Sequence, residues 1–195
     1  MSETIRPVQV IVAYDFSPSS EEAVLRAVEL ACRAPQHVLH VIAAIDPRSG
    51  LAISPPRGHV DYVYAEHIQK LVTSRLVAAF TGRKTASEVQ FYVHARIGKP
   101  ADQILGVAQE LGADLVMIGS HGKTGVERFV LGSVSERVVR EAQCPVIVAR
   151  TKRYADVSLE HVIELDHERH PYHPPHRYVY VDHRVIKRPM DWPLS

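Results

Sequence analysis

The sequence predicts an α/β protein whose core is a doubly wound sheet of five parallel strands. Five short runs rich in Val, Ile and Leu alternate along the chain with longer segments of helical periodicity, the order typical of strand–helix–strand units. The runs are almost continuously apolar, as in strands that helices cover on both faces. Most connections are short, as expected of right-handed crossovers between neighbouring parallel strands.

The expected strands and helices follow each other in turn. Strands are expected over residues 8–15, 37–45, 88–95, 114–120 and 145–150. Helices are expected over residues 17–33, 60–81, 100–111 and 133–142. Ser17 is a favourable N-cap and Pro18 suits the first helical turn, so the first strand is expected to turn directly into the first helix.

One connection is long. Residues 46–61, between the second strand and the second helix, are rich in Pro and Gly, whereas such connections usually have about 2 to 6 residues. The loop leaves the carboxyl end of a strand, where ligands of open α/β sheets bind, so a lid is one interpretation. A tolerated surface insertion is the other.

Composition limits the classes of function. The chain has 195 residues, of which 46% are hydrophobic, and a formal net charge of +1, so it favours neither nucleic acid nor an anionic membrane surface as a partner. The first residues do not resemble a signal peptide and no apolar run is long enough to span a bilayer, so we expect a cytoplasmic protein. Cys32 and Cys144 are expected to be buried reduced thiols.

A stretch rich in glycine and hydroxyl residues, GSHGKTGVERFVLGSVS, separates the fourth strand from the final helix. Gly119 ends the strand, and Gly132 and Ser133 open the helix. Free N–H groups and the helix dipole favour an anion at such a place, and glycine lets the anion approach the backbone. The stretch therefore predicts a phosphate site. The alternative is structural, with glycines that only make a turn and a serine that only caps the helix.

Two better-known phosphate motifs do not fit the sequence. Gly122-Lys123-Thr124 lacks the preceding glycine that a P-loop requires. The first strand is followed by AYDFSPSS and not by G-x-G-x-x-G. The phosphate interpretation therefore depends on the glycines near the final helix.

The spacing of these glycines resembles the motif G-x2-G-x9-G-[ST] of the nucleotide-binding branch of the universal stress proteins, the UspA-like family. Here it reads Gly119, Gly122, nine further residues, and Gly132-Ser133. Similarity extends to VAYDFSPSS after the first strand, LHVI in the second, RIGKPADQIL before the third helix and SERVVREAQCPVIVAR at the end. The resemblance runs from about Val8 to Arg150 in the correct order.

The resemblance implies an adenine nucleotide alpha hydrolase-like three-layer fold, a homodimer, and ATP, with or without magnesium, at the carboxyl edge of the sheet. Asp15 would accept a hydrogen bond from a ribose hydroxyl and Val41 would pack on adenine. His121 and Gly122 would meet the phosphates, which the start of the final helix would hold with N–H groups and hydroxyls. The implied nucleotide-binding residues are Ala13, Asp15, Val41, Ile118, Gly119, His121, Gly122, Gly132, Ser133, Val134 and Ser135.

Several of these residues have a structural alternative. Val41 and Ile118 would be core residues in any sheet of this kind, and Asp15 could cap the first turn. Gly98 is expected to end the third strand and to let a helix start at Pro100, although the resemblance places it near the nucleotide. The prediction therefore depends on the joint pattern.

The motif indicates a nucleotide binder more than an enzyme. Phosphoryl transfer needs a metal clamp and a group that orients the nucleophile, yet Glu127 lies in the loop and Asp15 is assigned to the ribose. We therefore expect an ATP-responsive regulatory or protective protein of the stress response, with an unidentified protein partner. The alternative is a weak ATPase or an autophosphorylating phosphotransferase, with Thr124, Ser133 and Ser135 as candidate acceptors.

Composition changes after Arg150, so the sequence predicts a domain over residues 1–150 and a C-terminal extension over residues 151–195. The extension holds six of the twelve histidines and five of the thirteen prolines. An H-x2-H spacing occurs twice, at His167, His170, His173 and His176. A metal-binding protein is therefore a third hypothesis, although the prolines prevent a helix from presenting these pairs on one face.

Residues 176–187 of the extension alternate as a half-buried strand would. Such a strand could form a hairpin or add to a sheet edge, and we expect it to pack on a dimer partner. A partly disordered tail is the alternative.

Overall fold

The structure is a computed structural model that describes residues 6–34, 36–48, 60–83, 88–122, 131–151, 180–181 and 184–185. The chain divides into two units, Met1–Lys152 and Arg153–Ser195. Each is considered by itself.

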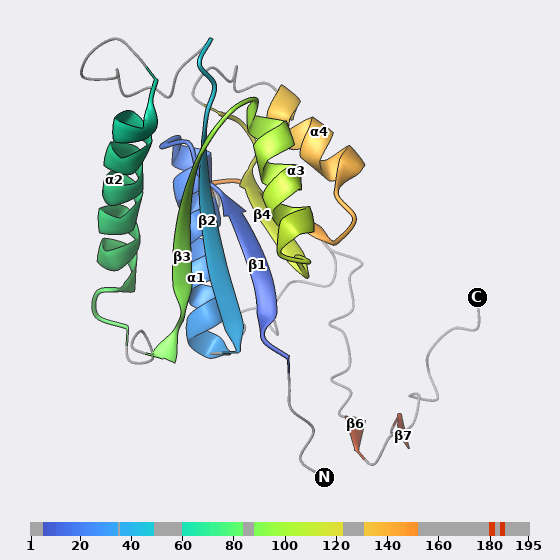
Figure 1. Cartoon of the computed structure of the whole chain (residues 1–195). Coiled ribbons are helices and arrows are strands. Elements are labelled where there is room, and N and C mark those ends of the chain that lie inside the picture. Colours follow the sequence, from blue (N-terminus) through green and yellow to red (C-terminus); the bar gives the residue numbers. More distant parts are fainter. Residues whose placement is uncertain are drawn as a thin grey trace, which may run out of the picture. The chain divides into compact units, whose positions relative to one another are not determined.

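The first unit is built on a five-stranded sheet in the order β3-β2-β1-β4-β5, with each neighbouring pair parallel. The strands are β1 (Val8–Ala13), β2 (His37–Ile45), β3 (Phe91–Ile97), β4 (Leu115–Gly119) and β5 (Val146–Ala149). The predicted α/β class with five parallel strands is confirmed (Figure 1).

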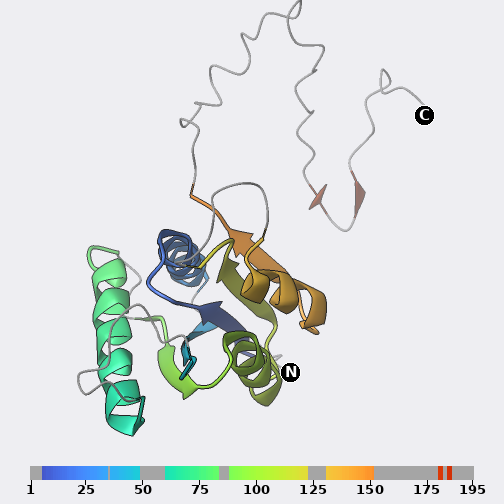
Figure 2. The same ribbon diagram turned by 90° about the horizontal axis from the view of Figure 1, so that it is seen from above.

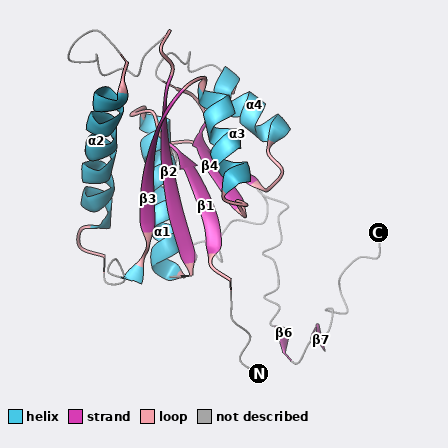
Figure 3. Cartoon of the chain, viewed as in Figure 1, coloured by secondary structure: helices cyan, strands magenta, loops and turns pink. Residues whose placement is uncertain are grey.

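Helices cover both faces of this sheet in three layers. The helices are α1 (Pro18–Arg33), α2 (Tyr62–Phe80), α3 (Pro100–Glu110) and α4 (Ser133–Glu141). Buried residues of α1 and α2 pack in one core and those of α3 and α4 in a second. The view from above shows the sheet between the two pairs of helices (Figure 2), and Figure 3 shows the alternation of strand and helix along the chain.

Alternate residues of the central strands supply the two cores. Leu39 and Val41 of β2 belong to the core under α1 and α2, whereas Ile42 belongs to the core under α3 and α4. Val10 and Ile11 divide β1 in the same way. Complete burial of such a side chain contributes about 1.5–3 kcal/mol. Burial on both faces explains why these strands are continuously apolar in the sequence.

The strand order creates a switch point between β1 and β4. From β1 the chain runs outward through β2 to β3, and then returns to the other side of β1 to form β4 and β5. The connections that follow β1 and β4 therefore leave in opposite directions, and the carboxyl ends of the strands at such a switch point are where ligands of these sheets bind.

Helix starts follow the sequence signals. Ser17 is the N-cap of α1, and its side chain accepts a hydrogen bond from the Ser20 N–H at 3.3 Å. Pro18 occupies the first helical position, as expected. Asp61 caps α2 by accepting from the Tyr64 N–H at 2.8 Å.

The third strand differs from its predicted bounds. It was expected over residues 88–95, but β3 spans Phe91–Ile97. Val89 is buried before the strand begins, and pairing with β2 continues as far as Ile97 opposite Ile45. Because β3 lies at the edge of the sheet, polar residues such as His94 and Arg96 can occupy it, and the apolar pattern ends before the strand does. Gly98 follows β3 with a φ of +150°, as its predicted role as a strand terminator requires.

Two further expectations concern the thiols and the membrane. Cys32 and Cys144 are not joined in a disulfide, as expected, but they are half-buried and not fully buried. Burial raises the pKa of the Cys144 thiol. Among the residues that the structure describes, no helix is both long and apolar enough to cross a bilayer.

In the second unit, β6 (Tyr180–Val181) and β7 (Arg184–Val185) form an antiparallel pair. The pair lies within residues 176–187, where we expected a hairpin or an added strand. The four histidines of the H-x2-H repeat lie outside the described residues.

A pair of histidines is enclosed on the sheet face. His40 of β2 is only 6% exposed, and its Nδ1 lies 3.1 Å from the Nε2 of His94 on β3. Its Nε2 lies 2.8 Å from the Gln9 Oε1 on β1, and its ring stacks on Tyr92 at 5.1 Å. Burial, and then the charge of His94, lower the pKa of His40 to about 4. Burial and Arg96 lower the pKa of His94, with an opposing effect of Glu110.

These depressed values predict loss of stability in acid. Unfolded histidine titrates near pH 6.5, so the free energy of unfolding is highest above that pH and decreases as the pH falls toward about 4, where His40 protonates in the folded state. The decrease due to His40 is about 3 kcal/mol. Urea unfolding at pH 7.0 and 4.5 should show a smaller difference for His40→Gln than for the wild type. His67→Gln, on the exposed side of α2, is the control; equal differences in all three proteins would contradict the prediction.

Candidate functional site

The turn after β1 delivers Asp15 to the carboxyl edge of the sheet. The Tyr14 N–H continues the pairing with β2 by donating to the Ile42 carbonyl at 2.9 Å. Phe16 then adopts a φ of +64°, which is unusual for a residue other than glycine. This conformation turns the chain sharply into α1. Such strain is commonly retained at functional sites.

The Asp15 carboxylate faces the segment that follows β4. Its Oδ1 accepts a hydrogen bond from the Ser17 N–H at 3.0 Å. Its Oδ2 lies 2.9 Å from the position that a Cβ on Gly122 would occupy. The absence of a side chain at Gly122 therefore lets this backbone lie beside the carboxylate, and the structure brings together two predicted site residues from distant parts of the sequence.

Gly119, at the end of β4, has a packing reason to be glycine. A Cβ at this position would lie 2.7 Å from the Ser19 carbonyl carbon and from the Ser20 N. The first turn of α1 thus rests directly on the Gly119 backbone. The Gly119 carbonyl accepts a hydrogen bond from the buried Ser135 hydroxyl at 2.7 Å. Close packing against α1 is therefore enough to explain a glycine at position 119 without a ligand.

The start of α4 meets the same segment from the other side. Gly132 is the N-cap, and its N–H donates to the Ser120 carbonyl at 2.9 Å. A Cβ on Gly132 would lie 3.4 Å from the His121 Cα and 3.7 Å from the Gly122 N. As in any α-helix, the first N–H groups of α4 have no intrahelical acceptor, and the N-cap Gly132 has no side chain to cap them. They carry the positive end of the helix dipole.

Two predicted donors of the phosphate site have partners within the protein. The Gly132 N–H is bonded to Ser120, and the hydroxyl of Ser135, which is 3% exposed, is bonded to Gly119. Ser133 is exposed at the same helix start. Thr124, also considered as an acceptor of phosphate, lies outside the described residues, as does Glu127.

His121 presents a buried nitrogen to this region. Its Nδ1 lies 3.0 Å from the Ser120 Oγ. Its Nε2 is shielded from solvent and, in the described part of the chain, has no hydrogen-bond partner. Such an atom is uncommon in folded proteins, because an unsatisfied buried polar group costs about 1–3 kcal/mol. An oxygen of a ligand would satisfy it.

The apolar members of the predicted site belong to the cores. Val41 is fully buried under α1 and α2, whereas Ala13 and Ile118 are buried under α3 and α4. Val41 and Ile118 are thus core residues, as their structural alternative expected. None of the three side chains is open to solvent in this structure.

Sequence reasoning missed two serines at the site. Ser17 was identified only as a helix cap and Ser19 was not singled out, yet both side chains donate to the His121 carbonyl. The signal was present in the cluster SPSS directly after the first strand. Their partner lies about a hundred residues away, so local patterns could not identify it.

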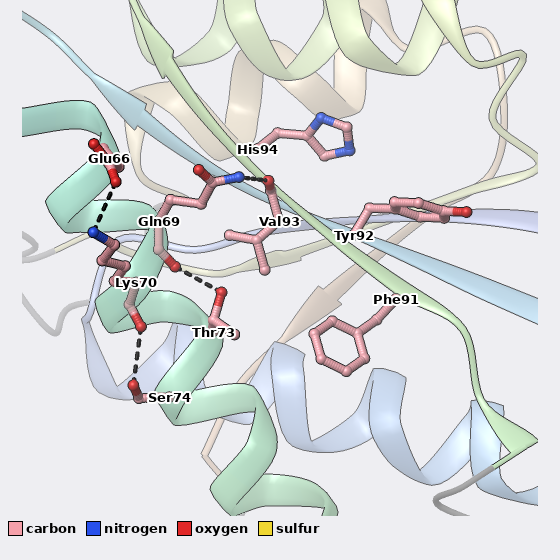
Figure 4. A pocket seen from close by; sticks show the side chains of 9 residues that line it. All are labelled: Glu66, Gln69, Lys70, Thr73, Ser74, Phe91, Tyr92, Val93 and His94. Atoms are coloured by element: carbon pink, nitrogen blue, oxygen red, sulfur yellow. Dashed lines mark hydrogen bonds and ion pairs between the residues drawn. The ribbon is translucent and has the colours of Figure 1, made fainter. Parts of the chain in front are cut away.

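A separate hollow lies at the β3 edge (Figure 4). It has a volume of about 670 Å³, and α2 and β3 line it. The Gln69 Nε2 donates to the Val93 carbonyl at 2.9 Å across it, and Lys70 pairs with Glu66 at 2.7 Å. Within the described ranges, no three His, Cys, Asp or Glu side chains gather as a metal ion would require. The hollow contains none of the predicted site residues.

Comparison with known proteins identifies relatives of this chain. The model of the universal stress protein family matches residues 9–150. A universal stress protein of Methanocaldococcus jannaschii is 32% identical over 145 residues, which are 73% of this chain and 81% of the relative.

Two solved structures share the fold. The universal stress protein UspA from Lactobacillus plantarum superposes with a TM-score of 0.56 at 26% identity, over 75% of this chain and all of that chain. A universal stress protein in complex with cAMP gives a TM-score of 0.53 at 25% identity, over 76% of this chain and 100% of that chain.

The contact between α1 and β4 predicts that alanine has opposite effects on the free energy of unfolding at two glycines. Gly119→Ala would force its Cβ against the backbone of Ser19 and Ser20, and should lower the free energy of unfolding by about 1–3 kcal/mol. Gly106→Ala in α3, where a Cβ meets nothing within 4 Å, should raise it by up to about 1 kcal/mol. Urea unfolding would measure both, and a harmless Gly119→Ala would disprove the packing described here.

Proposed function

This chain belongs to the universal stress protein family, and we propose that it binds an adenine nucleotide, in the first place ATP, as a nucleotide-responsive regulatory or protective protein of the stress response. The proposed site is the crevice between the carboxyl ends of β1 and β4. The observation that supports it is the meeting of three features around residues 120–122: the Asp15 carboxylate, the start of α4 without a side-chain cap, and the buried Nε2 of His121, which has no hydrogen-bond partner among the described residues.

The geometry suggests how a nucleotide would be divided over these groups. Asp15 would accept hydrogen bonds from the ribose hydroxyls, because the Oδ2 faces the segment at Gly122 while Oδ1 is held by Ser17. The base would lie above the carboxyl ends of the strands, with the apolar floor beneath it. The residues of that floor would be Ala13, Val41, Ile118 and Gly119.

The phosphates would lie at the start of α4. Since the Gly132 N–H and the Ser135 hydroxyl already have partners, the donors would be the N–H groups of Ser133, Val134 and Ser135 with the exposed hydroxyl of Ser133. Main-chain donors at a helix start and the helix dipole are a common phosphate site. The His121 Nε2 and the Gly122 backbone would complete the set.

The comparisons support the class of ligand. The structure in complex with cAMP comes from a universal stress protein that is 25% identical to this chain, so one protein of this fold accommodates an adenine nucleotide. The triphosphate is our inference from the motif and from the number of donors near α4. Magnesium would enter with the nucleotide.

We further propose a homodimer that acts on a protein partner in the cytoplasm. Ile147 on the edge strand β5 and Val139 on α4 are 45% and 44% exposed, which gives the sheet edge apolar groups that a second copy could cover. Residues 151–195 would form an appendage to this domain, beyond the residues that the family model matches.

A graded series at Gly132 tests the phosphate site. The purified protein should release ATP or ADP close to one per chain on denaturation, as measured by anion-exchange chromatography. Gly132→Ala should retain part of it, because a Cβ would just touch His121. Gly132→Val should retain almost none, because its added methyl groups would occupy the space between α4 and the segment 120–122. Gly106→Ala is the matched control, and full retention by Gly132→Val would refute the site.

Asp15→Asn tests the ribose contact. The amide keeps an oxygen for the Ser17 N–H, so the turn should survive, but the charged acceptor is lost. Hydrogen bonds to charged groups contribute about 1 kcal/mol more than neutral ones, so the dissociation constant for ATP should rise about fivefold by isothermal titration calorimetry. The control is Asp102→Asn on α3, which removes an exposed ion-pair partner of Arg137. It should leave the dissociation constant for ATP unchanged. Equal affinity of the wild type and Asp15→Asn would assign Asp15 to the turn alone.

A further inference from the structure

Two serines at the start of α1 hold the main chain of His121. The Ser19 hydroxyl donates to the His121 carbonyl and accepts from the His121 N–H at 3.4 Å. The Ser17 hydroxyl donates to the same carbonyl at 3.3 Å. The main-chain N–H and carbonyl of His121, in the loop after β4, are therefore both held by serines at the start of α1.

These bonds use the proton of each hydroxyl and both acceptor positions of the His121 carbonyl. A serine hydroxyl has one proton to donate and two lone pairs, and a carbonyl oxygen accepts two hydrogen bonds. Ser19 donates to and accepts from His121, whereas Ser17 donates to His121 and accepts from the Ser20 N–H as the cap of α1. Both protons and both acceptor positions of the carbonyl are thus assigned.

Helix capping explains only part of this arrangement. The bond from the Ser20 N–H to Ser17 is local and would be present in any capped helix. The bonds of Ser19 reach a residue 102 positions away in the sequence. Ser19 contributes nothing to the cap beyond its contact with the Ser17 hydroxyl at 3.4 Å.

The same serines are connected to the other side of the crevice. The Ser17 N–H holds the Asp15 carboxylate at 3.0 Å, while the Ser17 hydroxyl holds His121. Gly122, the next residue along the chain, lies beside the second oxygen of Asp15. Ser17 and Ser19 therefore fix the carboxylate and the segment after β4 in one framework.

We infer that Ser17 and Ser19 are positioning residues that set the separation between the Asp15 carboxylate and the His121–Gly122 backbone, and so favour ligands that carry both a ribose and a phosphate. This inference rests on the proposed nucleotide site. A ligand that spans both groups benefits from their fixed separation because no ordering of the loop is required on binding. A ligand that reaches Asp15 alone gains nothing from it.

Comparison of ATP with adenosine tests this inference. Ser19→Ala removes both of its bonds to His121 and leaves the cap of α1 in place. The dissociation constant for ATP should rise about tenfold, whereas that for adenosine, which has no phosphate, should change less than about twofold. Isothermal titration calorimetry on the full chain would measure both. Ser74→Ala is the matched control, because that serine also donates to a main-chain carbonyl, of Lys70, at an exposed position on α2.

A second variant guards against misfolding of the first. Ser17→Gly removes the other hydroxyl but keeps the N–H that binds Asp15, and glycine costs only a few tenths of a kcal/mol at an N-cap. This variant should raise the dissociation constant for ATP about threefold and leave the dissociation constant for adenosine unchanged. Circular dichroism and urea midpoints establish that each variant is folded.

The outcomes separate the inference from the proposed function. A wild type that binds ATP, with variants that bind it equally well, overturns the positioning role alone. An equal loss of affinity for ATP and for adenosine assigns the serines to general stability and also overturns the positioning role. A wild type that binds neither ligand overturns the proposed function together with the inference. Weaker binding of ATP with unchanged binding of adenosine supports the positioning role of the two serines.

Discussion

The close contact between the first turn of α1 and the backbone of Gly119 determines the geometry of this carboxyl edge. No side chain fits between them, since a Cβ at Gly119 would lie 2.7 Å from two backbone atoms of Ser19 and Ser20. Packing against α1 therefore fixes the position of the chain where it leaves β4. Ser17 and Ser19 can then reach the main chain of His121. Every other feature of the crevice is built outward from this contact.

The contact also joins the two outer layers of the fold. α1 covers one face of the sheet and α4 the other, yet both begin beside residues 119–122, and Gly132 and Ser135 bind Ser120 and Gly119 from the α4 side. The positive ends of two helix dipoles thus converge at the switch point of the sheet. Two helix starts at one place would stabilise an anion through their N–H groups and dipoles.

Local patterns in the sequence were sufficient for most of the fold but for only part of the site. β2 was predicted with its observed bounds, because it is buried on both faces and its apolar run ends where the strand ends. β3 extends two residues further than predicted, because an edge strand admits His94 and Arg96. The glycine spacing predicted that Gly122 and Gly132 lie near each other, and the structure brings them together. The partner of Ser19 and the bond of the Ser135 hydroxyl to Gly119 are tertiary contacts, which no pattern of neighbouring residues encodes.

The chemistry of these groups favours binding over turnover. In the proposed site, main-chain N–H groups and one carboxylate would contact the nucleotide with similar strength before and during phosphoryl transfer, and uniform binding of this kind does not lower the barrier to reaction. The Ser135 hydroxyl, which could have accepted a phosphoryl group, is buried and donates to Gly119. Binding energy at such a site is instead available to stabilise the conformation that holds the ligand. The proposed site would therefore be suited to report the presence of a nucleotide more than to consume it.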